Sequence, residues 1–343
     1  MTFSFKYVRL AGGSIIYQSK YLITIGSFGQ SMKYSFCLKR IFLVIPTLAG
    51  ITFITFLLLK ALPGDPAQGL AGERADPEVI QKIKNDLEPE KSLILQYAGY
   101  LKLIASGELG RSYYTNRNVR EDIAEKLPNT LRLAFAAMFF SAALGILFGT
   151  LMAAKQGSLW DRIGLVISTS GISIPLFWLG LLLIFIFSFR FQILPPSGMG
   201  EGSLIFLILP ASTLGLNSAA YIARITRAGM IEALSQPYIT TAKAKGLRAC
   251  SVIFKHGLKN TLIPVITLIG LDFASYLNGS VLTETIFGWD GIGRYAVEGI
   301  FKRDYPVIMG CVLVGAALFV MVNLLVDLLY GLFDPRIRYG SNK

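Results

Sequence analysis

The most informative segment of this chain lies between residues 235 and 260, and the chain as a whole gives little sign of catalytic chemistry. The chain has a single histidine, His256, and three cysteines that lie far apart and form no CxxC pair. This composition leaves little scope for histidine-based catalysis and predicts neither a disulfide framework nor a metal site. The chain has no Gly-Lys dipeptide and therefore no G-x-x-x-x-G-K-[ST] loop, so we do not expect it to cradle the phosphates of ATP. We expect no catalytic residue and no cofactor in the chain itself.

Residues 235–248, with the sequence SQPYITTAKAKGLR, have the pattern of a short capped helix. Pro237 suits the first turn of a helix, and Ser235 or Gln236 would cap it. Gly246 suits the left-handed residue that follows a helix end. A short rigid helix between two membrane spans can dock into another protein and transmit a rigid-body motion to the spans. The pattern alone leaves a second interpretation open, a solvated basic loop that only sets topology.

Long apolar blocks on both sides of this segment predict membrane-spanning helices. The chain is 53% hydrophobic and only 16% charged, whereas soluble domains carry about 25% charged residues. A helix needs roughly 20 apolar residues to cross the hydrocarbon core of a bilayer. Six segments meet this requirement: 41–59, 133–154, 163–189, 202–223, 260–283 and 305–326. We therefore expect an all-α membrane protein with six transmembrane helices.

The distribution of charge predicts the orientation of the chain. Basic residues dominate before the first span, between the fourth and fifth spans and after the sixth, whereas residues 62–131 carry slightly more acids than bases. Because cytoplasmic loops are enriched in Lys and Arg, both termini and the loop 224–260 should face the cytoplasm. The net charge of +12 then reflects membrane topology, and we expect no nucleic-acid partner.

These spans divide the chain into five parts. The parts are a basic cytoplasmic N-terminal segment (1–38), a first transmembrane helix (39–61), an extracytoplasmic loop (62–127), a transmembrane core (128–331) that contains the loop 224–260, and a cytoplasmic tail (332–343). Within the outer loop, Asp76 should cap a helix and residues 93–104 should form a second, amphipathic one. Residues 127–130 should open the second span. The patterns leave open whether translation starts at Met1 or at Met32.

The segment around Gly246 resembles the coupling segment of ABC importer permeases, in the version found in the peptide and nickel branch. That version reads Tyr-x-x-Thr-Ala-x-Ala-Lys-Gly-Leu, followed by His-x-Leu-x-Asn. The residues that match it are Tyr238, Thr241, Ala242, Ala244, Lys245, Gly246, Leu247, His256, Leu258 and Asn260. The Glu of the general Glu-Ala-Ala pattern is absent, as is its later Leu-Pro. Further segments similar to this branch, such as residues 282–287 and 291–294, extend the resemblance from about residue 40 to residue 338.

The resemblance implies a type I importer fold and a place in a larger assembly in the bacterial inner membrane. This chain would be the first of two related permease subunits, surrounded by lipid and forming half of the translocation pathway. Two cytoplasmic ATPase subunits would bind ATP and Mg²⁺, and an extracytoplasmic solute-binding protein would deliver the substrate. The residues expected to couple to the ATPases are Pro237, Tyr238, Thr241, Ala242, Lys245, Gly246, Leu247 and His256.

Asp272 lies near the middle of the fifth span. An acid at that depth usually faces a cavity or a partner. Two interpretations stay open: a residue of the translocation pathway that meets an amine or a metal, or a structural acid paired across a subunit interface. Ser275 and Asn278 would line the same face of the helix.

The cargo and the transport class also have alternatives. Within the resembled branch, a di- or oligopeptide importer is expected first. A nickel or metal-chelate importer is the alternative, because residues 293–297 and 303–308 look nickel-like. In a different class, an ATPase-independent channel or secondary transporter would predict an internal inverted repeat, and the sequence has none that we can see.

Overall fold

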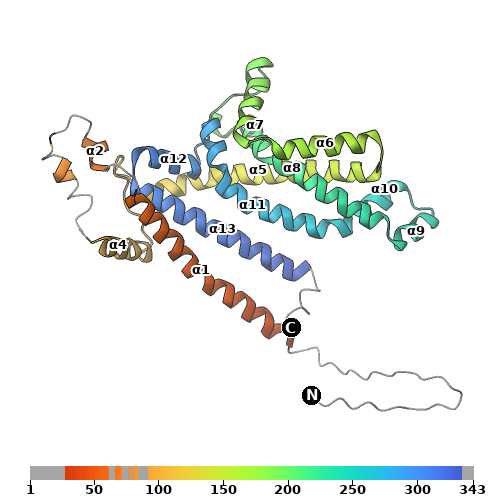
Figure 1. The fold of residues 1–343 in the computed structure, drawn as a ribbon, viewed down its shortest axis with the longest axis horizontal. Helices are drawn as coiled ribbons and strands as arrows, with labels where there is room; N and C mark the ends of the chain where they lie inside the picture. The colour runs from red at the N-terminus through yellow and green to blue at the C-terminus, as the bar shows by residue number, and fades with distance from the viewer. Residues whose placement is uncertain are drawn as a thin grey trace, which may run out of the picture. The chain divides into compact units, whose positions relative to one another are not determined.

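A computed structural model of the chain describes residues 28–61, 66–71, 76, 78, 80–83 and 92–333. Residues 1–43 and 44–343 form separate units; α1 begins in the first, and the other features below lie in the second. The described residues contain no β-strand and are almost entirely helical (Figure 1). The helices are α1 (Phe28–Ala61), α2 (Pro66–Ala71), α4 (Leu93–Ala105), α5 (Val119–Ala154), α6 (Leu159–Ser173), α7 (Leu176–Leu183), α8 (Ile205–Leu234), α9 (Pro237–Ala244), α10 (Ala249–Ser251), α11 (Lys259–Phe287), α12 (Ile292–Lys302) and α13 (Tyr305–Phe333). Two π-helical segments, η1 (Ile184–Arg190) and η3 (Val252–Leu258), continue α7 and precede α11, and η2 (Gly200–Gly202) is a 3₁₀ turn.

Four helical segments in the described part of the chain are each long and apolar enough to cross a membrane alone. They are Phe42–Ala61 of α1, all of α5, all of α8 and Tyr305–Val326 of α13. Two further apolar stretches are bent, by 108° between α6 and α7 and by 55° between Ala249–Leu262 and Pro264–Leu277. Up to six spans result if each bent pair counts as one. The prediction of an all-α membrane protein is confirmed, and the number six depends on the two bent pairs.

The expectation of one continuous helix over residues 163–189 was wrong. The helix breaks at Ile174, which has an extended conformation (ψ 125°) and precedes Pro175. A proline ring clashes with a helical conformation of the preceding residue and so favours such a break. The side-chain amide of Asn217 in α8 donates to two carbonyl oxygens of the last turn of α6, each at 3.3 Å. Backbone groups freed by a break in an apolar environment need such partners.

Helix boundaries differ from the sequence predictions at several other places. Helix α5 begins at Val119, with the Asn118 side chain accepting from the Arg120 backbone N–H (3.0 Å), so the helix begins before residues 127–130, which were expected to open the second span. Helix α8 continues to Leu234, so residues 224–234 are helical and not part of a loop. Within the outer loop, the predicted cap at Asp76 is confirmed, since its carboxylate accepts from the Glu78 N–H (3.2 Å). The predicted amphipathic helix over 93–104 is confirmed as α4.

Helices α5 and α8 make the most extensive helix contact in the described structure. Glycines bring their backbones close together. A Cβ atom added at Gly149 of α5 would lie 2.5 Å from the Ala223 carbonyl oxygen of α8, and one at Gly145 would lie 2.6 Å from the Ile222 side chain. Likewise, a Cβ atom added at Gly215 of α8 would come too close to atoms of α5. Small residues at such an interface gain van der Waals contact, which drives helix association where lipid offers no hydrophobic gain.

Helices α11 and α13 complete the bundle around this pair. A buried apolar cluster joins Leu133 of α5, Leu214 of α8, Leu277 of α11 and Val326 of α13. Within residues 44–343, α9 and α10 lie at one end of α8 and α11, and α12 lies at the opposite end of α11 (Figure 1). The bundle therefore presents two distinct ends, called here the α9 end and the α12 end.

We predict that Gly149→Leu separates α5 from α8. The new side chain would overlap backbone atoms of Ala223, and overpacking of this kind costs about 1–3 kcal/mol or more. Unfolding of the purified chain by SDS in mixed micelles should shift to lower SDS. The control is Gly50→Leu, because a Cβ at Gly50 meets no atom within 4 Å. Equal stability of the two variants would contradict the proposed packing role of Gly149.

Candidate functional site

Helix α9 has the ends that its sequence predicted. Pro237 occupies the first turn, and Gln236 is the N-cap residue, although its side chain makes no capping hydrogen bond. Ser235, the alternative cap, instead ends α8. Gly246 follows the helix with φ +75° and donates its N–H to the Lys243 carbonyl oxygen (2.9 Å). The segment is therefore a short helix with a left-handed end and not an irregular loop.

The inward side of α9 is held against the bundle by apolar contacts. Ile239 is 1% exposed and Ala242 is also buried, and both pack against Val252 of η3 and Leu234 of α8. Ala242, one of the predicted coupling residues, therefore seats the helix and does not face outward. This seat makes α9 a rigid extension of α8.

A polar contact ties α9 to the start of α11. The Asn260 side-chain amide donates to the Tyr238 hydroxyl at 2.7 Å, so two residues of the sequence motif that are 22 positions apart meet in the structure. His256, also in the motif, is partly buried in η3. The outward side of the segment is exposed and carries the remaining predicted coupling residues, which are Pro237, Tyr238, Thr241, Lys245, Gly246 and Leu247.

The surroundings of Gly246 explain the residue type only in part. A Cβ added there would meet no atom of the described residues within 4 Å, so packing among them does not require glycine. The positive φ does favour glycine, since β-branched residues rarely adopt it. Space beside Gly246 is open, and a partner that docks on this side could use it.

The three predicted pathway residues lie on α11 but in different surroundings. Asp272 is partly buried, and its Oδ2 atom is enclosed without a hydrogen-bond partner among the described residues. Its polar neighbour is the Ser218 hydroxyl of α8. Ser275 is exposed, and its hydroxyl donates to the Leu271 carbonyl oxygen (3.1 Å). The side chain of Asn278 lies outside the described residues. Both interpretations of Asp272 remain as predictions.

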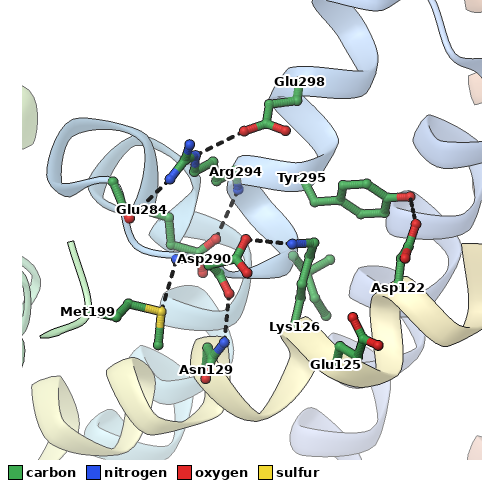
Figure 2. Close-up of polar contacts among 12 residues, drawn as sticks. Asp122, Glu125, Lys126, Asn129, Met199, Glu284, Asp290, Arg294, Tyr295 and Glu298 are labelled. Atoms are coloured by element: carbon green, nitrogen blue, oxygen red, sulfur yellow. Dashed lines mark hydrogen bonds and ion pairs between the residues drawn. The ribbon is translucent and has the colours of Figure 1, made fainter. Parts of the chain in front are cut away.

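A second polar centre, absent from the predicted site residues, lies at the α12 end and surrounds Glu284 (Figure 2). Glu284 is fully buried, at 0% exposure. Its Oε1 accepts from the hydroxyls of Thr130 (2.8 Å) and Ser280 (2.9 Å), and its Oε2 accepts from the Arg294 backbone N–H (2.9 Å). These contacts join the ends of α5, α11 and α12. We call this group, with Gly291, Ile292 and Gly293, the Glu284 cluster.

Two glycines and a threonine allow the chain to wrap around this carboxylate. A Cβ at Gly291 would overlap the Glu284 carboxylate, and one at Gly293 would lie 2.7 Å from the Val281 Cα. The Thr130 hydroxyl, besides donating to Glu284, accepts from the Ile292 N–H (2.9 Å). The signal in the sequence was an acid at the end of an apolar span, followed within ten residues by Gly-x-Gly.

Further polar contacts extend the Glu284 cluster toward the surface of the α12 end (Figure 2). The Asn129 amide donates to the Asp290 carbonyl oxygen (2.8 Å), and Lys126 forms an ion pair with the Asp290 carboxylate. The Tyr295 hydroxyl donates to the buried Asp122 carboxylate (2.7 Å). Burial raises the pKa of Tyr295 well above its usual value, and the Asp122 charge adds to the effect. Tyr295 therefore stays protonated and remains a hydrogen-bond donor at neutral pH.

Two protein-family models match the chain. The model described as "Binding-protein-dependent transport system inner membrane component" matches residues 145–339, and its N-terminal counterpart matches residues 33–134. The first match contains α9, Asp272 and all of the Glu284 cluster except Thr130, which lies in the second match.

Three relatives illustrate the similarity. The di/tripeptide transport system permease protein DppB of Pseudomonas aeruginosa (strain UCBPP-PA14) is 41% identical over 332 residues, with 89% of this chain and 99% of the relative covered. The dipeptide transport system permease protein DppB of Escherichia coli (strain K12) is 40% identical, with 89% and 98% covered. The glutathione transport system permease protein GsiC of Pectobacterium atrosepticum is 41% identical, with 89% and 99% covered.

Solved structures of amino-acid importers share the fold. An inward-facing structure of the MetNI methionine ABC transporter superposes with a TM-score of 0.53 at 16% identity, covering 62% of this chain and 95% of the other. An amino acid ABC transporter with histidines gives a TM-score of 0.50 at 20% identity, covering 62% and 94%. At these identities the likeness concerns the fold alone.

We predict that Glu284→Ala destabilises the α12 end. The substitution leaves two hydroxyls and a backbone N–H without their acceptor, and each buried unsatisfied group costs about 1–3 kcal/mol. Detergent-solubilised protein should lose several degrees of Tm in a thermal unfolding assay. Glu298→Ala is the matched control, since the Glu298 side chain is 45% exposed and forms an ion pair with Arg294 one turn away on α12, where such pairs contribute about 0–1 kcal/mol. A Tm loss no larger than that of the control would show that the Glu284 cluster does not stabilise the bundle.

Proposed function

Because the chain belongs to the family of binding-protein-dependent transport system inner membrane components, we propose that it is the permease subunit of an ABC importer for di- or oligopeptides. The observation that carries this proposal is the α9 segment, a short helix held against the bundle by apolar contacts, with exposed residues along its outward side. A subunit that another protein drives needs such a surface. The family match and the multi-pass apolar helices agree with a place in the inner membrane.

The charge distribution supports an orientation. Basic residues flank the α9 end, as expected for the cytoplasmic side. We propose that α9 and both termini are cytoplasmic and that α12 and the Glu284 cluster lie at the extracytoplasmic face. The solute-binding protein would then approach the α12 end, and two ATPase subunits would bind at the α9 end.

ATP hydrolysis is assigned to the partner subunits. In this proposal α9 docks on an ATPase subunit through its exposed side, and closure of the ATPase pair displaces it. The apolar seat passes the displacement to α8, and the contact between Tyr238 and Asn260 passes it to α11. A second, related permease subunit would supply the other half of the pathway. ATP shifts the assembly between inward and outward opening only if it binds the two states with different affinity.

The cargo is proposed from the relatives. Those reported above are named for dipeptides, di- and tripeptides, and glutathione, which is itself a tripeptide. Their identity of about 40% extends over 89% of this chain. This supports peptides as the cargo in preference to the nickel or metal-chelate alternative.

We predict that Gly246→Val abolishes coupling while the chain still inserts. Valine at φ +75° is strained, since the left-handed conformation costs an L-residue about 1–2 kcal/mol, and its branches would occupy the open space beside α9. Hydrolysis stimulated by the binding protein, and dipeptide uptake into proteoliposomes, should fall at least tenfold. Gly246→Asn is the matched control, because asparagine tolerates positive φ, and it should retain most activity. Wild-type hydrolysis and uptake in an inserted Gly246→Val complex would overturn the assignment of α9.

The cargo has a direct test. Proteoliposomes that hold the full complex, supplied with its binding protein and ATP, should accumulate a radiolabelled dipeptide and should not accumulate ⁶³Ni²⁺ under the same conditions. Complex lacking ATP is the control. Accumulation of nickel without the dipeptide would overturn the peptide assignment and leave the permease assignment intact.

A further inference from the structure

An ion pair between a buried carboxylate and a partly buried guanidinium joins α6 to α8 near the α9 end. Asp161, in the first turn of α6, is 2% exposed. Arg227 of α8 donates to both of its oxygens, from Nε to Oδ1 at 2.6 Å and from Nη2 to Oδ2 at 2.8 Å. The Gly157 N–H donates to Oδ2 as well, at 2.9 Å. A bidentate guanidinium–carboxylate pair fixes both distance and orientation.

The opposite end of α6 is also bound to α8. There the Asn217 side chain of α8 donates to the carbonyl oxygens of Gly171 and Ile172. The positions 161 and 171 on α6 thus meet 227 and 217 on α8, which is the order of two antiparallel helices in register. Polar contacts at both ends hold α6 along the length of α8, so the two should move together.

The position of Arg227 along α8 gives the pair a mechanical consequence. Helix α8 continues from Arg227 to Leu234, and α9 follows after two residues. On the other side, α6 is the first helix of a bent apolar pair, which turns by 108° into α7 at Pro175; this pair is called the broken span below. The ion pair is therefore the polar contact nearest to α9 that the described residues show between α8 and α6, the helix that enters the bend.

We propose that Asp161 and Arg227 are positioning residues for transport: their ion pair fixes α6 to α8, so that a displacement of α9 also moves the broken span. This inference rests on the proposed role of α9. Apolar contacts fix the register of two helices less strictly than a bidentate ion pair, which requires one distance and one orientation. Loss of the pair leaves only the Asn217 contacts as the polar contacts described between α6 and α8. The displacement of α8 and α9 should then no longer move the start of α6, and hydrolysis would continue without transport.

The test uses the assembled complex in proteoliposomes with its binding protein. We compare Arg227→Gln, Arg227→Lys and Asp161→Asn with the wild type, and Arg224→Gln is the control, because Arg224 is exposed one turn away on the same helix. The measured quantities are ATP hydrolysis and dipeptide molecules imported per ATP. Arg227→Gln and Asp161→Asn should keep hydrolysis within about twofold and lose at least tenfold in import per ATP. Arg227→Lys keeps the positive charge but cannot make the bidentate contact. Its import per ATP should lie between that of these two variants and that of the wild type.

A distance measurement separates positioning from a merely structural role. Spin labels replace the exposed residues Arg162 and Lys243, in a background in which the native cysteines are serine. In the otherwise native chain the distance between the labels should stay the same with and without ATP and vanadate. In Arg227→Gln it should change with nucleotide, because α9 then moves without α6.

Each remaining outcome decides the proposal. Wild-type import per ATP in both Arg227 variants overturns it, and so does an unchanged label distance in Arg227→Gln. If Arg227→Gln fails to assemble, Arg227→Lys decides: reduced import per ATP supports the proposal, and wild-type import shows a purely structural pair and overturns it. A wild-type complex without hydrolysis stimulated by its binding protein would instead overturn the proposed function.

Discussion

The close contact between α5 and α8 is the constraint on which the other features depend. At Gly149 the two backbones approach so closely that no side chain fits between them. Helices that touch at this distance cannot rotate or slide without a clash, because protein interiors are packed to crystal-like density. Helix α5 carries Thr130, an acceptor and donor of the Glu284 cluster, whereas α8 carries Arg227 and leads into α9. The Glu284 cluster and the Asp161–Arg227 ion pair are thus attached to opposite ends of the rigid α5–α8 pair.

The environment explains why the polar side chains lie where they do. In an apolar surrounding a broken helix must find partners for its free backbone groups, and Asn217 supplies them where α6 ends. A buried carboxylate likewise needs donors, and Glu284 has two hydroxyls and a backbone N–H. These side chains permit departures from straight helices at places where the fold has a bend or a sharp turn.

Local features of the structure were predictable from the sequence, and features that depend on distant residues were not. The ends of α9 follow from Pro237 and Gly246, whose backbone preferences act within one turn. The membrane class follows from hydropathy. In contrast, an average over an apolar window cannot register the bend at Pro175, because the flanking residues are equally apolar on both sides. Thr130 and Glu284 are 154 positions apart, and Asp161 and Arg227 are 66 apart, so no local pattern joins them.

Rigidity of the α5–α8 pair also restricts where the chain can change shape. A displacement that enters at α9 cannot be absorbed between α5 and α8, so it must appear where helical hydrogen bonding is irregular. Two such places lie beside the pair: the bend between α6 and α7, continued by the π-helical η1, and the π-helical η3 before the 55° bend at the start of α11. π-Helical turns often accompany functional sites, since their backbone differs from that of the regular helix.

Asp272 lies on α11 beyond the second bend, between that bend and the Glu284 cluster. A motion of α9 that reorients α11 at η3 would therefore change the surroundings of Asp272 while the α12 end stays closed around Glu284.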